Sequence, residues 1–324
     1  MCYPAGMRGI WKTAIAGFCT IVAVGAQGGT RSGAREAVLE RLNRDDLRVG
    51  SLGYRLATSN SQRCARQMPG TGLILHSLDQ YRGDWRETAV RLFGTIGGVA
   101  IEGVVAQSPA ALAGFQPGDE LIAINGRPLD RVSEPANAST LRRDQTEETL
   151  ASLPPQGPVR ITVLRSGQAR DLILRPVQAC RVRFEVIAGS ARFARTDGRI
   201  IQLGQELTAP LSDESIAFVL AHELAHSILD HRTQLALFEQ QGRSKVAAKK
   251  RLDMAREFED QADRLSIHLL VQAGFDPWAG PRFMRRLGTR FDKASTGGKI
   301  HRPAQARAEL MEAEIAGLQA VTAG

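Results

Sequence analysis

The sequence predicts an α+β protein, a mainly helical unit into which a β-rich domain is inserted. Apolar residues recur at helical spacing in residues 34–60 and again after residue 210. Between them, residues 95–176 form short β-type runs separated by glycine and proline, as in a domain of strands and tight turns. The 324 residues are enough for two domains, each with its own core.

The composition is that of a folded globular protein. Hydrophobic residues make up 43% and charged residues 23% of the chain, which excludes disordered and collagen-like classes. The formal net charge of +8 comes mostly from scattered arginines, without a basic block interleaved with aromatic residues. This distribution predicts a solvated basic surface and no nucleic-acid partner.

Residues 1–26 have the parts of an export signal. Arg8 and Lys12 precede a small, apolar run from Thr13 to Ala26, whose last three residues fit a cleavage site. The run is shorter than the roughly 20 residues that span a bilayer. We therefore expect cleavage near Ala26 and a periplasmic or secreted protein. Retention of the segment as an anchor, and peripheral association with a membrane, remain open.

Two cysteines, Cys64 and Cys180, follow that cleavage site. In an exported chain such a pair is most simply one disulfide, and two unrelated buried thiols are the alternative. A bridge would join the two ends of the segment between them, as expected if a self-contained domain is inserted there.

The first element predicted is a helix over residues 34–60, with a break near Gly50. The β-rich segment then predicts, in order, a strand at 99–105, a short helix from Ser108, a strand at 119–124, a helix at 140–153, and a hairpin of 159–164 with 171–174.

The run SPAALAGFQPGDELIAINGRPL, residues 108–129, resembles a PDZ domain of the bacterial exported type. It places strand, helix and turn with Gly-Asp and Asn-Gly in a fixed order. The resemblance implies a PDZ-like domain over residues 89–178 that takes the C-terminal end of a peptide as an added strand. We place the turn that holds the peptide carboxylate at Leu92-Phe93-Gly94, so Phe93 and Gly94 are the predicted peptide-binding residues. A packing module without a peptide ligand is the alternative.

The last part of the chain changes from strands to helices. Alternating runs over residues 180–207 predict strands around an Asp197-Gly198 turn. Three helices follow, one over 216–231 capped by Ser212 or Asp213, one over about 252–273, and one that begins at Asp276-Pro277.

The first of these helices carries His222-Glu223-Leu224-Ala225-His226, an HExxH motif. Residues four apart share one face of a helix, so both imidazoles can bind one zinc ion. Glu223 can reach a water at the open position of such a site and act as general base and then acid. The surrounding residues are almost wholly apolar, and unpaired ionisable groups would be costly there. A structural pair of core histidines is the alternative.

The third ligand has to come from elsewhere in the chain. Leu229 and Arg232 occupy the positions where a metzincin has Gly and His, which excludes that class. A carboxylate on the next helix is the common solution, and spacing alone leaves Glu257, Glu259 and Asp260 open.

HELAHSILDH together with ExxAD, after an export signal, resembles the HtpX/BepA/LoiP-like zinc metalloendopeptidases (metallopeptidase family 48) over roughly residues 180–315. The resemblance implies a zincin-type fold formed by residues 27–88 and 179–324, with His222, His226 and Glu259 as zinc ligands. It makes Asp263 the residue that orients a ligating imidazole. It also implies a late histidine near the metal, followed six residues on by arginine, which matches His301 and Arg307. This chain departs from the family at Arg302, which precedes Pro303.

The remaining histidines, His76, His231 and His268, are expected to be structural.

The predicted function is hydrolysis of peptide bonds in unfolded or extended proteins by an exported, zinc-dependent endopeptidase with one zinc per chain. Envelope quality control is the role that the resemblance implies. His301 would gate the metal or stabilise the oxyanion. The alternative is a non-catalytic PDZ adaptor or chaperone-like protein whose zinc site is structural or latent.

Overall fold

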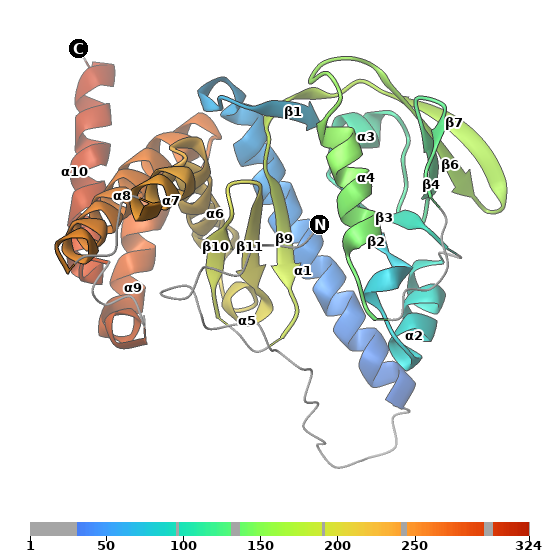
Figure 1. The fold of residues 1–324 in the computed structure, drawn as a ribbon, viewed down its shortest axis with the longest axis horizontal. Helices are drawn as coiled ribbons and strands as arrows, with labels where there is room; N and C mark the ends of the chain where they lie inside the picture. The colour runs from blue at the N-terminus through green and yellow to red at the C-terminus, as the bar shows by residue number, and fades with distance from the viewer. Residues whose placement is uncertain are drawn as a thin grey trace.

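The computed structural model describes residues 31–94, 97–130, 137–189, 192–240, 245–294 and 301–323. Helix α1 (Arg31–Ser59) crosses the middle of the molecule, between a domain built around a six-stranded sheet and a mainly helical domain (Figure 1). The predicted export signal lies outside the described residues. None of the described helices has the length and apolarity needed to cross a bilayer.

Helix α1 continues through Gly50, where the sequence predicted a break. A Cβ atom at Gly50 would lie 2.7 Å from Cδ1 of Ile74, and one at Gly53 would overlap the ring of Phe184. The two glycines therefore let α1 approach a strand of each domain closely. Its apolar side chains also contribute to both cores, Leu56 on the helical side and Leu39 toward the sheet domain.

The sheet domain, residues 73–174, is an antiparallel sheet in the order β2-β3-β4-β6-β7, with β5 paired to β4. It has the predicted succession of strand, short helix, strand, helix and hairpin. Its elements are β2 (Leu73–Ser77), α2 (Asp84–Phe93), β3 (Val99–Val104), α3 (Pro109–Leu112), β4 (Glu120–Ile124), β5 (Arg127–Pro128), α4 (Leu141–Ala151), β6 (Val159–Arg165) and β7 (Gln168–Leu174).

The sheet domain begins earlier than the predicted boundary at residue 89. Strand β2 pairs with β3 from Leu73 opposite Val104 to Ser77 opposite Val99, and it forms one end of the strand order. The boundary was placed too late because α2 separates this short strand from the other strands in the sequence. The inserted domain therefore includes a segment that was predicted to belong to the peptidase part.

The helical domain contains the rest of the described chain, including a 3₁₀ turn at Ser61–Arg63. A second 3₁₀ turn, Leu78–Gln80, follows β2 in the sheet domain. The strands of the helical domain form the pair β1-β8 and a sheet in the order β10-β11-β9, in which β11 runs parallel to β9. Its elements are β1 (Gln67–Gly70), β8 (Val177–Cys180), β9 (Arg183–Ile187), β10 (Ala194–Thr196), β11 (Ile200–Gly204), α5 (Gln205–Thr208), α6 (Asp213–Ile228), α7 (His231–Gln240), α8 (Lys245–Gln272), α9 (Ala279–Ala294) and α10 (Ala304–Ala323).

The predicted disulfide between Cys64 and Cys180 is present, with the two Cα atoms 5.4 Å apart. It lies beside the β1-β8 pair, where the chain leaves the helical domain and returns to it. The bridge therefore joins the two ends of the inserted domain, as the sequence suggested.

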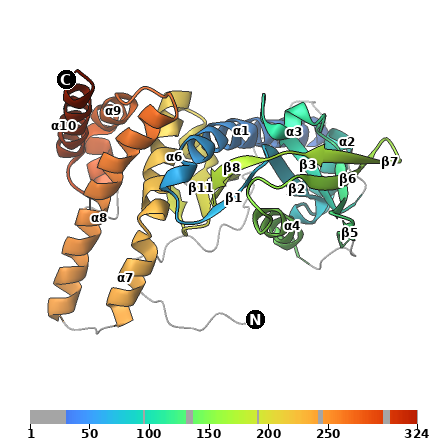
Figure 2. The same cartoon turned by 90° about the horizontal axis from the view of Figure 1, so that it is seen from above.

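Helix α6 is the centre of the helical core. Ser212 caps it by accepting a hydrogen bond from the backbone N–H of Ser215, one of the two capping residues predicted. Its apolar residues are buried from Ile216 to Ala221 and pack against α8, whose Ala262 is fully buried. This small residue lets the two helices approach closely. Figure 2 shows α7 and the first half of α8 projecting from the body side by side.

Candidate metal centre and peptide groove

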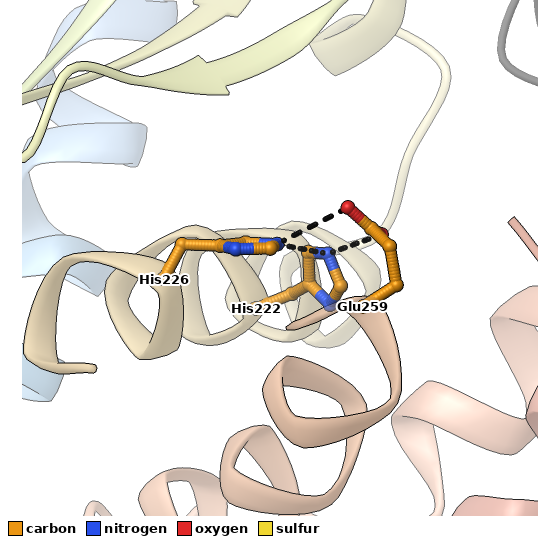
Figure 3. Close-up of side chains that lie close together, drawn as sticks. All are labelled: His222, His226 and Glu259. Carbon is orange, nitrogen blue, oxygen red and sulfur yellow. Dashed lines mark hydrogen bonds and ion pairs between the residues drawn. The ribbon is translucent and has the colours of Figure 1, made fainter. Parts of the chain in front are cut away.

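Three side chains from α6 and α8 converge on one point (Figure 3). Nε2 of His226 lies 3.1 Å from Nε2 of His222. The Glu259 carboxylate closes the triangle, with Oε2 3.4 Å from Nε2 of His222 and Oε1 3.5 Å from Nε2 of His226. Among the described residues, these three form the cluster able to hold a metal ion.

This geometry fits a zinc ion. Histidine nitrogen and carboxylate oxygen bind zinc at about 2.0–2.2 Å, so ligand atoms in a tetrahedral site lie about 3.3 Å from one another. The three observed separations lie close to that value. Two imidazoles and one carboxylate leave a fourth position open, as in catalytic rather than structural zinc sites.

The structure distinguishes the three carboxylates that spacing left open. Glu257 is exposed and accepts a hydrogen bond from Gln261. Asp260 is buried, but both its oxygens bind the guanidinium of Arg302. Glu259 is the one of the three that faces both imidazoles.

Asp263 and Arg307 support the cluster from behind. Oδ1 of Asp263 lies 3.0 Å from Nδ1 of His222, on the opposite side of that ring from the convergence point. The Arg307 guanidinium binds both Asp263 oxygens, at 2.7 and 2.6 Å, and both side chains are buried. Burial would raise the pKa of Asp263, but the charge of Arg307 outweighs it and lowers that pKa. Asp263 is therefore an ionised acceptor that can orient His222.

The electrostatics of the cluster favour a cation at the convergence point. Burial would lower the pKa of His222, but hydrogen bonds to Asp263 and Glu259 outweigh it and raise that pKa to about 10. Burial and the neighbouring His222 lower the pKa of His226 to about 3. The pKa of Glu259 is also lowered, because the histidines around it outweigh its burial. The carboxylates therefore attract positive charge, which a divalent cation supplies as well as a proton does.

Glu223 follows His222 on α6 and keeps part of its surface exposed. Burial of its carboxylate, and secondarily the charge of Glu259, raise its pKa to about 7. A carboxylate with a pKa near the working pH can both take up and release a proton.

His301 reaches the cluster from the segment before α10. Its Nδ1 lies 2.9 Å from Oε2 of Glu259, so the predicted proximity to the centre is present. The next residue is the departure from the family noted above, Arg302, and its ion pair with Asp260 of α8 fixes this segment next to the cluster.

His231 contacts the centre, although the sequence indicated only a structural role. Its Nδ1 lies 2.9 Å from Nδ1 of His226. It begins α7, one residue after Asp230, whose positive φ of 51° turns the chain back toward α6. That turn was the missing signal, because five residues along a continuous helix would have placed His231 off the ligand face.

The other two histidines lie elsewhere: His76 is buried against Phe93, and His268 pairs with Glu314.

A strand next to the predicted Asp197-Gly198 turn lies beside the cluster. β10 pairs with β11 on one side and packs on α6, where the hydroxyls of Thr196 and Ser227 are 2.9 Å apart. It is the outer strand of its sheet within the described part of the chain.

The sheet domain has a groove between β2 and α4. A cavity of about 120 Å³ opens there, lined by the turn Gly70-Thr71-Gly72, Leu73 and Leu75 of β2, and Leu150 and Ala151 of α4. Residues of α1 and Phe184 of β9 form its far wall. Phe93 and Gly94 lie outside this groove, since Phe93 packs on His76 and Gly94 ends α2. The structure thus places the predicted carboxylate-holding turn away from the groove.

Residues 101–165 match the family model of the PDZ domain. The chain contains a PDZ domain. The chain is also similar to the magnetosome formation protease MamE of Magnetospirillum gryphiswaldense, with 35% identity over 77 residues. That alignment covers 24% of this chain, and the chain spans only 8% of the length of MamE.

Two solved structures resemble the PDZ domain. The HtrA-type protease AlgW with a decapeptide matches 35% of this chain and 30% of its own, with 23% identity and a TM-score of 0.26. The HtrA3 PDZ domain bound to a phage-derived ligand matches 35% of this chain and 90% of its own, with 17% identity and a TM-score of 0.26. The family match and the likeness to MamE together indicate a protease-related protein that contains a PDZ domain.

Proposed function

We propose that this protein is an exported zinc endopeptidase of the HtpX/BepA/LoiP-like type that cleaves unfolded or extended polypeptides. The observation that carries the proposal is the convergence of His222, His226 and Glu259 beside Glu223. A structural zinc site has no use for a carboxylate next to an open position, whereas a hydrolytic site requires one.

The residues of α6 and α8 would divide the reaction between them. His222, His226 and Glu259 would hold the zinc, which supplies Lewis acidity toward a carbonyl and toward water. Glu223 takes a proton from the attacking water and delivers it to the leaving amine nitrogen, and its pKa near 7 suits both transfers. Asp263 keeps His222 oriented, and Arg307 keeps Asp263 ionised.

An extended substrate would bind along β10. This strand lies against α6 and is the outer strand of the described sheet, so a polypeptide can pair with it as a further strand. Strand pairing recognises backbone rather than side chains, which suits unfolded segments of varied sequence. Quality control in the cell envelope is a role consistent with that preference.

The PDZ domain would hold the C-terminal end of a polypeptide in the β2-α4 groove. The turn Gly70-Thr71-Gly72 precedes β2 and offers backbone N–H groups for a carboxylate, and the cavity beside Leu73 and Leu150 takes the last side chain. A cavity of 150 Å³ accommodates benzene, so about 120 Å³ suits one aliphatic side chain.

Export is supported by the disulfide as well as by residues 1–26. Disulfides such as Cys64–Cys180 persist mainly in oxidising compartments outside the cytosol. We therefore assign the protein to the periplasm or the extracellular space.

The decisive test compares the full chain with Glu223→Gln. We expect one zinc in both proteins, and casein cleavage about 10³-fold slower in the variant because the proton acceptor is lost. Glu214→Gln, an exposed glutamate on the same helix, is the matched control and should cleave like the unsubstituted chain. Equal cleavage by Glu223→Gln and the unsubstituted chain would contradict the proposal.

One observation favours the second candidate, a PDZ adaptor with a latent zinc site. The imidazole of His301 contacts Glu259, one of the proposed ligands, and would cover the zinc in a latent site. His301→Ala separates the two functions. Faster casein cleavage than in the unsubstituted chain indicates a gated peptidase, whereas no cleavage by either zinc-loaded protein indicates the adaptor.

A further inference from the structure

We propose that His231 is a positioning residue for the metal centre, and that it orients His226 through a chain of hydrogen bonds ending at Glu257. This inference rests on the proposed zinc site. It concerns His231, which lies outside the HExxH and ExxAD motifs, and it gives the two ligand imidazoles different partners.

The first link joins His226 to His231. With Nε2 of His226 facing the convergence point, the proton of its neutral ring has to be on Nδ1. That Nδ1 lies 2.9 Å from Nδ1 of His231, which therefore accepts the hydrogen bond. His231 consequently carries its own proton on Nε2.

The next links have matching donors and acceptors. Nε2 of His231 lies 3.1 Å from Oε1 of Gln261 and donates to it. The amide nitrogen of the same Gln261 donates to Oε1 of Glu257 at 3.1 Å. Each group in this chain thus has a single role, and the exposed carboxylate of Glu257 ends it. The chain favours the His226 tautomer that leaves Nε2 free to bind metal.

Packing holds His231 in this position. The side chain is buried, and its ring stacks on Phe258 with the centroids 4.1 Å apart and the planes 7° from parallel. Phe258 is next to Glu259 on α8, so the same helix supplies a ligand, the surface for the stack and the acceptor Gln261. His222 differs, because its Nδ1 faces the carboxylate of Asp263.

Two substitutions separate hydrogen bonding from packing. His231→Phe keeps an aromatic ring on Phe258 but removes the acceptor for His226. His231→Asn loses the ring but places an amide oxygen near the position of Nδ1. His76→Phe is the matched control, since His76 is also a buried histidine that contacts a phenylalanine ring, edge-on to Phe93, but lies in the PDZ domain.

The measurement is the zinc dissociation constant of the full chain, obtained by competition with a chromogenic chelator. We expect His231→Phe to weaken zinc binding about 10- to 100-fold, His231→Asn to recover most of that loss, and His76→Phe to bind like the unsubstituted chain. Thermal unfolding of the metal-free proteins is the second readout. His231→Phe should unfold there at the same temperature as the unsubstituted chain, because its packing is preserved.

Several results would overturn this inference. Unchanged zinc affinity in His231→Phe would contradict the proposed role. If His231→Asn weakened zinc binding as much as His231→Phe does, packing of the ring and not its hydrogen bond to His226 would explain the effect. If His231→Phe does not fold, Gln261→Leu replaces it, and its zinc binding should be about threefold weaker. Unchanged zinc binding in Gln261→Leu would count against the chain of hydrogen bonds. Absence of zinc binding by the unsubstituted chain would instead contradict the proposed function itself.

Discussion

Buried carboxylates gather at two places in this molecule, and their pKa values move in opposite directions. At the metal centre the pKa values of Glu259 and Asp263 are lowered, because imidazoles and the Arg307 guanidinium outweigh burial. Where α1 meets the PDZ domain, burial dominates and raises the pKa values of Asp46 and Glu102. The first group is ionised and attracts a cation. The second binds protons more readily than ordinary carboxylates do.

The second place is an interdomain cluster of Asp46, Glu102, Arg143 and Glu185. Asp46 of α1 accepts a hydrogen bond from the backbone N–H of Val186 at 2.8 Å, and Arg143 of α4 pairs with Glu185 of β9 at 2.7 Å. Its residues thus connect α1, the PDZ domain and the sheet of the helical domain. The comparison teaches that buried acidic residues alone do not indicate a metal site. The cationic groups around them decide whether they are ionised.

The largest expected effect tests the ionised state of the metal centre. Arg307→Met leaves the charge of Asp263 buried without its partner, which should lower the free energy of unfolding by about 3–5 kcal/mol. Arg285→Met is the matched control, because Arg285 binds Glu312 with the same geometry on an exposed surface, and should cost less than about 1 kcal/mol. Urea unfolding measures both. Similar small losses would mean that Asp263 is not held as a buried anion.

The next effect tests the protonation of the interdomain cluster. The pKa of Glu102 is raised to about 7, so the folded protein binds its proton more tightly than the unfolded chain does. The stability that the fold gains from binding this proton is fully present below about pH 4.5 and is lost as the pH rises through 7. At about 1.4 kcal/mol per pKa unit it amounts to about 3 kcal/mol.

Glu102→Gln should therefore gain about 3 kcal/mol of unfolding free energy relative to the unsubstituted chain between pH 4 and pH 8. Urea unfolding at several pH values gives the difference. The amide oxygen introduced by Glu102→Gln can still accept the hydrogen bond from Asn43, so loss of that contact does not complicate the result. A difference independent of pH would show that Glu102 is ionised in the fold, like the carboxylates of the metal centre.

The smallest effect concerns the peptide groove, which lies next to the interdomain cluster. Glu147 and Phe184 line both the groove and the pocket around that cluster. Ala151→Phe fills the cavity and should weaken binding of a peptide ending in a free valine carboxylate about tenfold, or about 1.4 kcal/mol. Fluorescence anisotropy measures the affinity, and the amidated peptide serves as the control ligand. If Phe93→Ala weakened binding while Ala151→Phe did not, the groove would be misplaced and the turn at Phe93 would be restored.

The sequence predicted the convergence of His222 and His226 better than the position of the peptide groove, for a physical reason. His222 and His226 lie four apart on one helix, and local spacing determines which face they share. β2 contains only five residues and joins the PDZ sheet across the intervening α2, so its pairing depends on tertiary contacts. The contact of His231 likewise depends on one backbone turn at Asp230. The predicted helix break at Gly50 was wrong because the glycine makes room for Ile74. That contact is distant in sequence, so the local pattern could not reveal it.

The most direct test of the central claim is the zinc content of the purified full chain and of two variants on α8. Elemental analysis should find one zinc per chain in the unsubstituted protein and in Asp253→Asn, which alters an exposed carboxylate. Glu259→Gln should lose most of its zinc, because a neutral amide replaces the ligand that faces both imidazoles. No zinc in the unsubstituted chain, or zinc retained in Glu259→Gln and lost in Asp253→Asn, would contradict this account.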